Sequence, residues 1–192
     1  MRSLPVVVLT AVLLLCGCGP RAITKGSHPF PAKTGIFTDA SGKILFGFPD
    51  SEEPYRLAFL DFAWCPACQS AWEAVMEAST TAAPGSVRIY RILFDRETLF
   101  TESGEIETAP LRAASRPGTE FRGNEGNVTV TTLTAIPAAF RKEFRVSHAP
   151  LLLLLSREGE VKRRWQGYST NLKEEISAEL SKIAPYRSSP PT

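Results

Sequence analysis

The sequence predicts one α/β domain in which helices flank a central mixed sheet. Apolar runs typical of strands alternate along the chain with stretches in which apolar residues recur at helical spacing. An unbroken leucine run over residues 151–155 fits a strand that is buried on both faces. The chain has 192 residues, which after removal of a short leader suffice for one compact domain but hardly for two.

The first residues predict export. Arg2 precedes an apolar run over residues 4–15, which is shorter than the about 20 residues that a membrane-spanning helix needs. Residues 1–17 are therefore predicted to be a signal peptide. The end of the run, Leu15-Cys16-Gly17-Cys18, resembles a bacterial lipobox, which implies that Cys18 becomes the first residue and carries lipid. An ordinary cleaved signal peptide is the alternative.

The segment after Cys18 is rich in Pro, Gly, Ser and basic residues and shows no periodicity. Residues 18–33 are therefore predicted to form a lipidated N-terminus and flexible tether. The domain itself is predicted over residues 34–185, and residues 186–192 are predicted to be a disordered tail. Two short strands around a Gly-containing turn open the domain as a β-hairpin.

Strand and helix patterns continue in mixed order. The last helix is expected to begin at Asn171, with Glu174 completing a capping box. A long stretch over about residues 96–127 has only faint periodicity and is predicted to be an insertion that covers one face of the domain or hangs free. The elements expected after the hairpin are strands at 56–62, 87–94, 128–131, 151–155 and 161–166, and helices from 66, over 137–144 and from 171.

Two cysteines stand at the junction between the strand at 56–62 and the helix that follows. In Trp64-Cys65-Pro66-Ala67-Cys68, the first thiol lies at the helix N-terminus, where unpaired N–H groups and the helix dipole favour a thiolate. Cys68 follows one turn later and is placed to resolve a mixed disulfide on Cys65. Pro66 fits the first helical position and stiffens the site. Since Cys16 leaves with the leader and Cys18 carries lipid, the mature domain keeps this one pair.

This motif, its preceding strand and Val146-Ser147-His148-Ala149-Pro150 before a buried strand resemble a thioredoxin-like protein. With the opening hairpin and the insertion, the resemblance extends to the membrane-tethered TlpA and ResA branch, which are extracytoplasmic disulfide reductases. The resemblance implies a thioredoxin-like fold and a cis-proline at Pro150 beside the reactive sulfur. It also implies that Ala149 offers its backbone to an extended substrate, with Trp64 and Pro66 bordering the same site.

The chain departs from the family at two places. Ala149 stands where a branched or hydroxyl residue is usual, so the partner surface is expected to differ. Phe59 stands where thioredoxins keep a buried acid, and Asp61 comes two residues later. Asp61 is therefore given no role in proton transfer.

A Cys-x-x-Cys pair has other uses besides thiol–disulfide exchange. A zinc site lacks a second cysteine pair and has only His28 and His148 as imidazoles. Copper(I) held by the two thiols and His148 is a further possibility, because soft thiolates suit this ion. A permanent structural disulfide would close too small a ring to stabilise the chain much. A redox-inert domain that docks partners through the insertion is the last alternative.

The sequence thus predicts an exported thiol–disulfide oxidoreductase, lipid-anchored to a bacterial membrane, with its domain in the periplasm or on the outer face. Reduced Cys65 would attack a disulfide of a secreted client, Cys68 would resolve, and a membrane electron donor thiol protein would re-reduce the pair. No metal or organic cofactor is expected, and a net charge of +2 gives no footprint for nucleic acid. A disulfide oxidase or isomerase and a Cu(I)-binding chaperone lipoprotein are the alternative functions.

Overall fold

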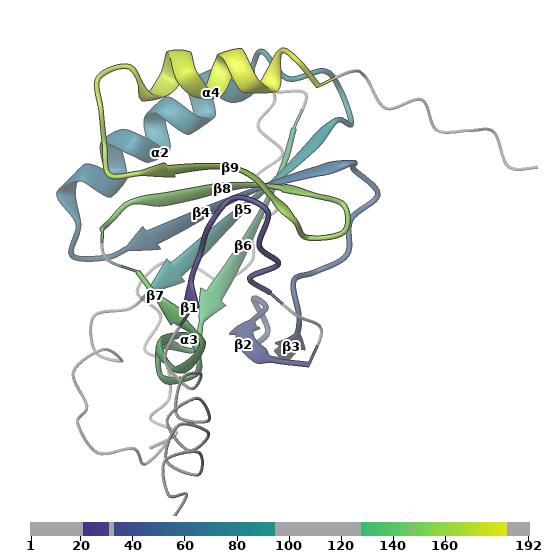
Figure 1. Cartoon of the computed structure of the whole chain (residues 1–192), viewed down its shortest axis with the longest axis vertical. Helices are drawn as coiled ribbons and strands as arrows, with labels where there is room; N and C mark the ends of the chain where they lie inside the picture. Colours follow the sequence, from purple (N-terminus) through teal and green to yellow (C-terminus); the bar gives the residue numbers. More distant parts are fainter. Residues whose placement is uncertain (1–20, 31–32, 95–127, 147, 184–192) are drawn as a thin grey trace, which may run out of the picture.

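The computed structural model describes residues 21–30, 33–94, 128–146 and 148–183 (Figure 1). Four predictions fall on residues outside these ranges: the signal peptide, lipidation of Cys18, the insertion over about residues 96–127 and the tail over 186–192. None of the described helices is long and apolar enough to cross a membrane.

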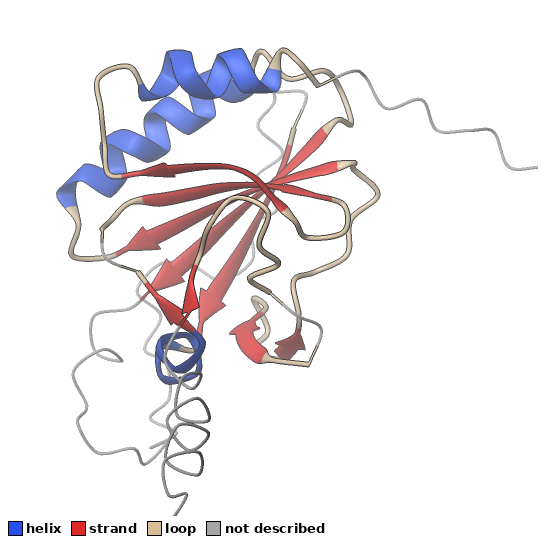
Figure 2. Ribbon diagram, in the orientation of Figure 1, coloured by secondary structure: helices blue, strands red, loops and turns tan. Residues whose placement is uncertain are grey.

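A seven-stranded mixed sheet forms the centre of the domain, and the predicted α/β architecture is confirmed (Figure 2). The strand order is β3-β2-β6-β5-β4-β8-β9. Central strand β4 pairs in parallel with β5 and antiparallel with β8. The strands of this sheet are β2 (Gly35–Thr38), β3 (Ile44–Phe46), β4 (Tyr55–Phe62), β5 (Val87–Phe94), β6 (Thr129–Ala135), β8 (Leu151–Ser156) and β9 (Val161–Gln166).

The middle of the sheet is buried on both faces, as the leucine run of β8 predicts. All six residues of β8 are buried, and in β4 every residue after Tyr55 is buried. Because both faces of these strands are buried, the strands carry continuous apolar runs instead of alternating polar and apolar residues. Strand β6 runs past the predicted 128–131 to Ala135, which pairs with Phe37 of β2.

Helices α2 (Pro66–Ser79) and α4 (Leu172–Leu180) lie together on one face of the sheet, and α3 (Pro137–Glu143) lies on the other (Figure 1). The predicted capping box is wrong. Asn171 occupies the N-cap of α4 but has φ −96° and ψ 7°, not the extended backbone of a capping residue, and its side chain makes no capping hydrogen bond. Helix α3 ends one residue before the prediction, because Phe144 starts strand β7. Three apolar residues of α4, Leu172, Ile176 and Leu180, are buried at helical spacing, and Ile183 is buried beyond the end of the helix.

The N-terminal segment over residues 21–30 is packed against the domain, which corrects the prediction of a flexible tether through residue 33. Strand β1 (Arg21–Ala22) pairs in parallel with β7 (Phe144–Arg145). Ile23 is buried, and the ring of Phe30 stacks on that of Phe48 at a centroid distance of 5.0 Å. The tether interpretation missed these two apolar residues, whose burial anchors a segment that is otherwise polar.

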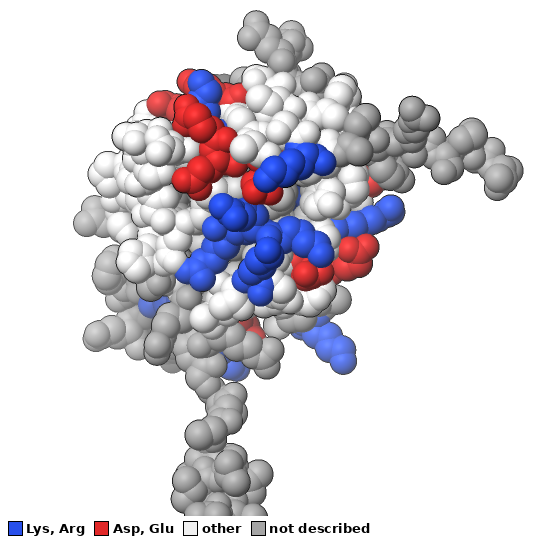
Figure 3. Space-filling model, turned by 45° about the horizontal axis from the view of Figure 1, so that its top comes forward, with Lys and Arg blue, Asp and Glu red and all other residues white. Residues whose placement is uncertain are grey.

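The outer edge of β9 is partly covered by the same segment. The Gly26 N–H donates to the Val161 carbonyl at 2.8 Å, and the Val161 N–H donates to the Ser27 carbonyl at 2.9 Å. The basic cluster Lys162-Arg163-Arg164 was predicted from the sequence to be the solvated side of an edge strand; Lys162 and Arg163 are exposed, whereas Arg164 is half-buried. Lys and Arg side chains gather across the face of the molecule seen in Figure 3.

Candidate functional site

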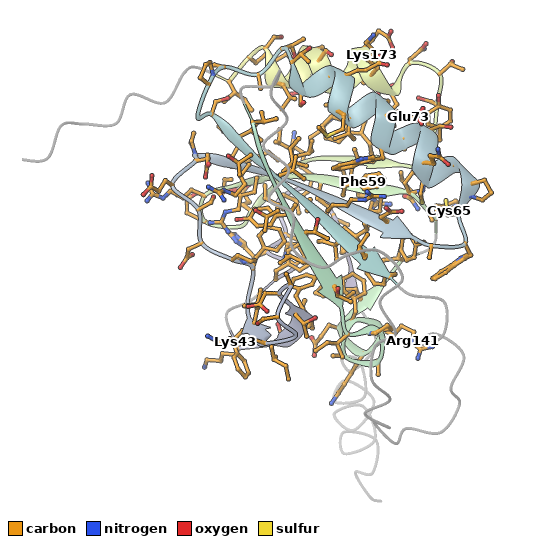
Figure 4. The ribbon with its side chains drawn as sticks, turned by 180° about the vertical axis from the view of Figure 1, so that it is seen from behind. Lys43, Phe59, Cys65, Glu73, Arg141 and Lys173 are labelled. Carbon is orange, nitrogen blue, oxygen red and sulfur yellow. The ribbon has the colours of Figure 1, made fainter. Side chains whose placement is uncertain are left out.

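Cys65 lies between the end of β4 and the start of α2 (Figure 4), and Cys68 lies in the first turn of that helix. Cys65 is the N-cap residue with an extended backbone, and its N–H donates to the Phe62 carbonyl at 2.9 Å. The Cys68 N–H donates to the Cys65 carbonyl at 3.0 Å. Pro66 takes a first-turn position of α2, where a missing N–H leaves no hydrogen bond unmade. Cys65 therefore lies at the positive end of the helix dipole.

The two thiols differ sharply in their surroundings. Both are free cysteines; Cys65 is half-buried, whereas Cys68 is only 1% exposed. Burial, followed by a hydrogen bond to Cys65 and the nearby charges of Cys65 and Asp61, raises the pKa of Cys68 to about 12. At neutral pH, Cys68 is therefore a protonated thiol, and Cys65 is the sulfur that a partner can reach.

The loop before β8 lies at the same end of the sheet as the motif. Leu151 pairs with Leu60, so Pro150 is level with the end of β4 from which the motif departs. The Ala149–Pro150 peptide bond is cis, and Pro150 is buried. A parallel strand leading to Cys-x-x-Cys at a helix N-terminus, with a cis-proline loop entering the neighbouring antiparallel strand, is the arrangement that the sequence implied. The fold is thioredoxin-like.

Comparisons with known proteins give matches only among solved structures; no family model and no curated protein matches this chain. StoA from Bacillus subtilis is 14% identical, with 78% of this chain and 98% of that chain covered and a TM-score of 0.45. The exposed lipoprotein thioredoxin Etrx1 from Streptococcus pneumoniae is 13% identical, with coverage of 77% and 98% and a TM-score of 0.45. A putative thiol:disulfide interchange protein DsbE from Chlorobium tepidum is 14% identical, with coverage of 83% and 96% and a TM-score of 0.49.

Two exposed aromatic side chains border the motif end of this thioredoxin-like domain. Trp64 is 38% exposed and packs its ring against Phe62 at a centroid distance of 5.3 Å. Tyr168 is 46% exposed and follows Gly167, whose N–H donates to the Pro150 carbonyl at 2.9 Å. Tyr168 was not predicted as a site residue. The sequence could have placed it there, because a strand at 161–166 that runs antiparallel to the strand at 151–155 must end beside the start of that strand.

An ion pair under the motif was also missed. Asp61 is 8% exposed, and the Arg91 Nε donates to its Oδ2 at 2.7 Å. The Arg91 guanidinium lies 4.7 Å from the ring centroid of Trp72 on α2, and that ring lies 5.4 Å from the ring of Phe59. Phe59, at the place of the family's buried acid, is thus a core residue. Asp61 acts through its charge on Cys68 and is paired with an arginine.

His148 is exposed, and its Nδ1 contacts the side-chain amide of Gln166. Over the described ranges, no three His, Cys, Asp or Glu side chains lie close enough together to hold a metal ion. The copper(I) alternative that the sequence left open stays a prediction. His28 lies elsewhere, with its Nδ1 3.3 Å from the Glu158 carbonyl oxygen.

Proposed function

We propose that this chain is a thiol–disulfide oxidoreductase that reduces disulfides of secreted client proteins. The observation that carries the proposal is the unequal pair of thiols, with Cys65 reachable at the N-terminus of α2 and Cys68 buried one turn later. A buried thiol with a raised pKa stays protonated until its neighbour has formed a mixed disulfide. This order of events suits exchange chemistry better than a permanent structural bridge.

The reaction runs in two exchange steps. The Cys65 thiolate attacks one sulfur of the client disulfide; a bond to Cys65 forms, the client S–S bond breaks and one client thiolate leaves. Cys68 then loses its proton and attacks the Cys65 sulfur, so the Cys65–Cys68 bond forms and the second client thiolate leaves. The client gains two electrons and the pair loses two. A membrane dithiol donor returns them by the same exchange, and no metal or organic cofactor takes part.

The client would lie as an extended segment against the loop before β8. Ala149 is partly exposed beside Pro150 and offers a backbone to which an extended peptide can hydrogen-bond. Trp64 and the exposed Pro66 would border the bound segment on the side of the motif. These four residues are the proposed substrate contacts.

The chain would work outside the cytoplasm, held to the membrane by lipid on Cys18. A Cys18→Ala variant should lose lipid and leave the membrane fraction after export. Fractionation is followed by a high-salt wash, which removes protein held to the membrane by charge alone. If the variant still fractionated with membranes after this wash, the lipid anchor would be contradicted, while the redox proposal would stand.

The reduction potential of the Cys65–Cys68 pair is the first measurement to make. A soluble form beginning at Gly19 keeps every described element and can be equilibrated against thiol buffers. A potential near or below about −250 mV supports a reductase, whereas one of about −120 to −180 mV indicates an oxidase or isomerase. A Cys65→Ala variant should lose all disulfide reduction; retained activity would overturn the catalytic role of the motif.

A further inference from the structure

We propose that the domain rests on anionic phospholipid headgroups through the basic edge formed by β9, the β8–β9 turn and the N-terminal segment. We call this surface the basic edge; its cations are Lys25, Arg157, Lys162, Arg163 and Arg164. The proposal deepens the lipid anchor proposed above, on which it rests, by naming the face of the domain that meets the membrane.

The first argument is the short distance from the packed segment to Cys18. Strand β1 begins at Arg21, so only Gly19 and Pro20 separate Cys18 from a residue that is hydrogen-bonded into the domain. Even fully extended, three residue steps span at most about 11 Å. A lipid on Cys18 would therefore hold the domain against the headgroups, because no long tether lifts it away.

The second argument is where the segment leads. The Arg164 guanidinium donates to the Ile23 carbonyl at 2.8 Å, and Gly26 and Ser27 pair with Val161. The segment that leaves the anchor therefore crosses directly onto the strand that carries the basic side chains. The basic edge and the proposed anchor are joined by a few ordered residues.

The third argument is the charge of this surface. Lys25, Arg157 and Arg163 are exposed, and Figure 3 shows how Lys and Arg side chains gather on this face. Two carboxylates lie among the five cations: Glu160 pairs with Lys162 at 2.6 Å, and Glu158 lies exposed in the β8–β9 turn. Further Asp and Glu side chains border the basic cluster in Figure 3. The surface keeps an excess of positive charge. Attraction to an anionic leaflet falls off over about a Debye length, a distance comparable to the link to Cys18.

The orientation that follows lays the β9 edge along the membrane. Because β8 runs antiparallel to β4, the turn that carries Arg157 lies at the end of the sheet opposite the motif. Arg21, where the segment begins, pairs instead with Phe144, whose ring lies in an aromatic cluster with Phe140 and Phe94 at the motif end. The anchor and Arg157 would therefore contact the membrane at opposite ends of the domain. An acidic protein surface could bind the same cations. The experiment below distinguishes such a protein from phospholipid headgroups.

The experiment measures partitioning of the soluble form beginning at Gly19 onto vesicles of phosphatidylcholine with and without phosphatidylglycerol. The variant reverses three exposed cations of the basic edge: Lys25→Glu, Arg157→Glu and Arg163→Glu. Its control makes the same change in net charge on the hairpin side and α3: Lys33→Glu, Lys43→Glu and Lys142→Glu. Arg164 is left in place, since it holds the segment.

The wild-type protein should bind vesicles only when they contain phosphatidylglycerol, and salt should weaken this binding. Each basic residue near an anionic surface contributes roughly fivefold, so the basic-edge variant should partition about 100-fold more weakly, and the control much less so. No binding to phosphatidylglycerol vesicles, or equal loss in both variants, overturns the proposal. If the wild-type form binds an acidic partner protein but no vesicles, and the basic-edge variant does not bind that protein, the surface is assigned to the partner protein instead. The form tested lacks Cys18, so a failed anchor does not affect the result.

Discussion

Two carboxylate–arginine pairs connect β5 to its neighbours, and they have different consequences. Near the start of β5, Arg88 holds both oxygens of Glu53 at 3.0 Å. Further along, Arg91 holds Asp61 at 2.6 Å beneath the motif. Both carboxylates are almost fully buried. Only Asp61 lies close enough to Cys68 for its charge to raise the pKa of that thiol. The same kind of pair is thus structural at one end of the domain and electrostatically linked to a thiol at the other.

The largest difference between the motif end and the Glu53 end of the domain should appear in the turnover of disulfide reduction. Cys68→Ala should lower steady-state disulfide reduction at least 100-fold, because the mixed disulfide on Cys65 can no longer be resolved from within the domain. Mass spectrometry should find the client attached to Cys65. Glu53→Gln, at the other end, should keep its turnover once the measurement is made well below its unfolding transition. Full turnover in Cys68→Ala would remove the resolving role.

The next effect compares the two ion pairs directly. Asp61→Asn and Glu53→Gln should each lower the free energy of unfolding by about 1–3 kcal/mol, because each leaves an arginine without its charged partner. Denaturant unfolding of both variants measures this loss.

Only one of the two variants should change the chemistry of the pair. Asp61→Asn removes a negative charge near Cys68 and leaves Arg91, so the pKa of Cys68 should fall. The rate at which Cys68 displaces a chromogenic thiol from Cys65 should then rise at a lower pH than in wild type. Glu53→Gln should leave this pH profile unchanged. Identical profiles for the two variants would mean that Asp61 is purely structural.

A further effect should appear at alkaline pH, in the pH dependence of stability of the reduced protein. The pKa of Cys68 rises from 9.0 to about 12 on folding, so the folded state holds this proton more tightly. The resulting stabilisation is present below pH 9 and is lost as the pH rises toward 12, by up to about 1.4 kcal/mol per pH unit. Unfolding of reduced wild type and Cys68→Ala at several alkaline pH values isolates this contribution. A stability difference that does not change with pH would contradict the shift.

Regular sequence patterns predicted most of the helices and strands, whereas contacts between residues far apart in the sequence could not be predicted. Strands β5 and β9 have the predicted bounds because turn residues lie next to them: Pro84-Gly85 before β5, and Gly159 and Gly167 on either side of β9. The pair of thiols and the cis-proline loop were predicted by motif and resemblance. The packing of residues 21–30 was missed because it depends on Ile23 and Phe30 contacting strands far along the chain. The Asp61–Arg91 pair was missed for the same reason, since parallel pairing of β4 with β5 brings the two residues together.

The smallest effect should come from a substitution of Asn171, for which the predicted capping box was wrong. A side chain that caps a helix usually contributes about 1 kcal/mol, but Asn171 makes no capping hydrogen bond because its backbone is already close to helical. Asn171→Ala should therefore change the free energy of unfolding by less than about 0.5 kcal/mol. Denaturant unfolding measures the change, with Leu172→Ala as the matched contrast. Leu172 is 2% exposed in the core, and its truncation should cost about 2–5 kcal/mol. A loss of 1 kcal/mol or more in Asn171→Ala would show that the cap forms in solution after all.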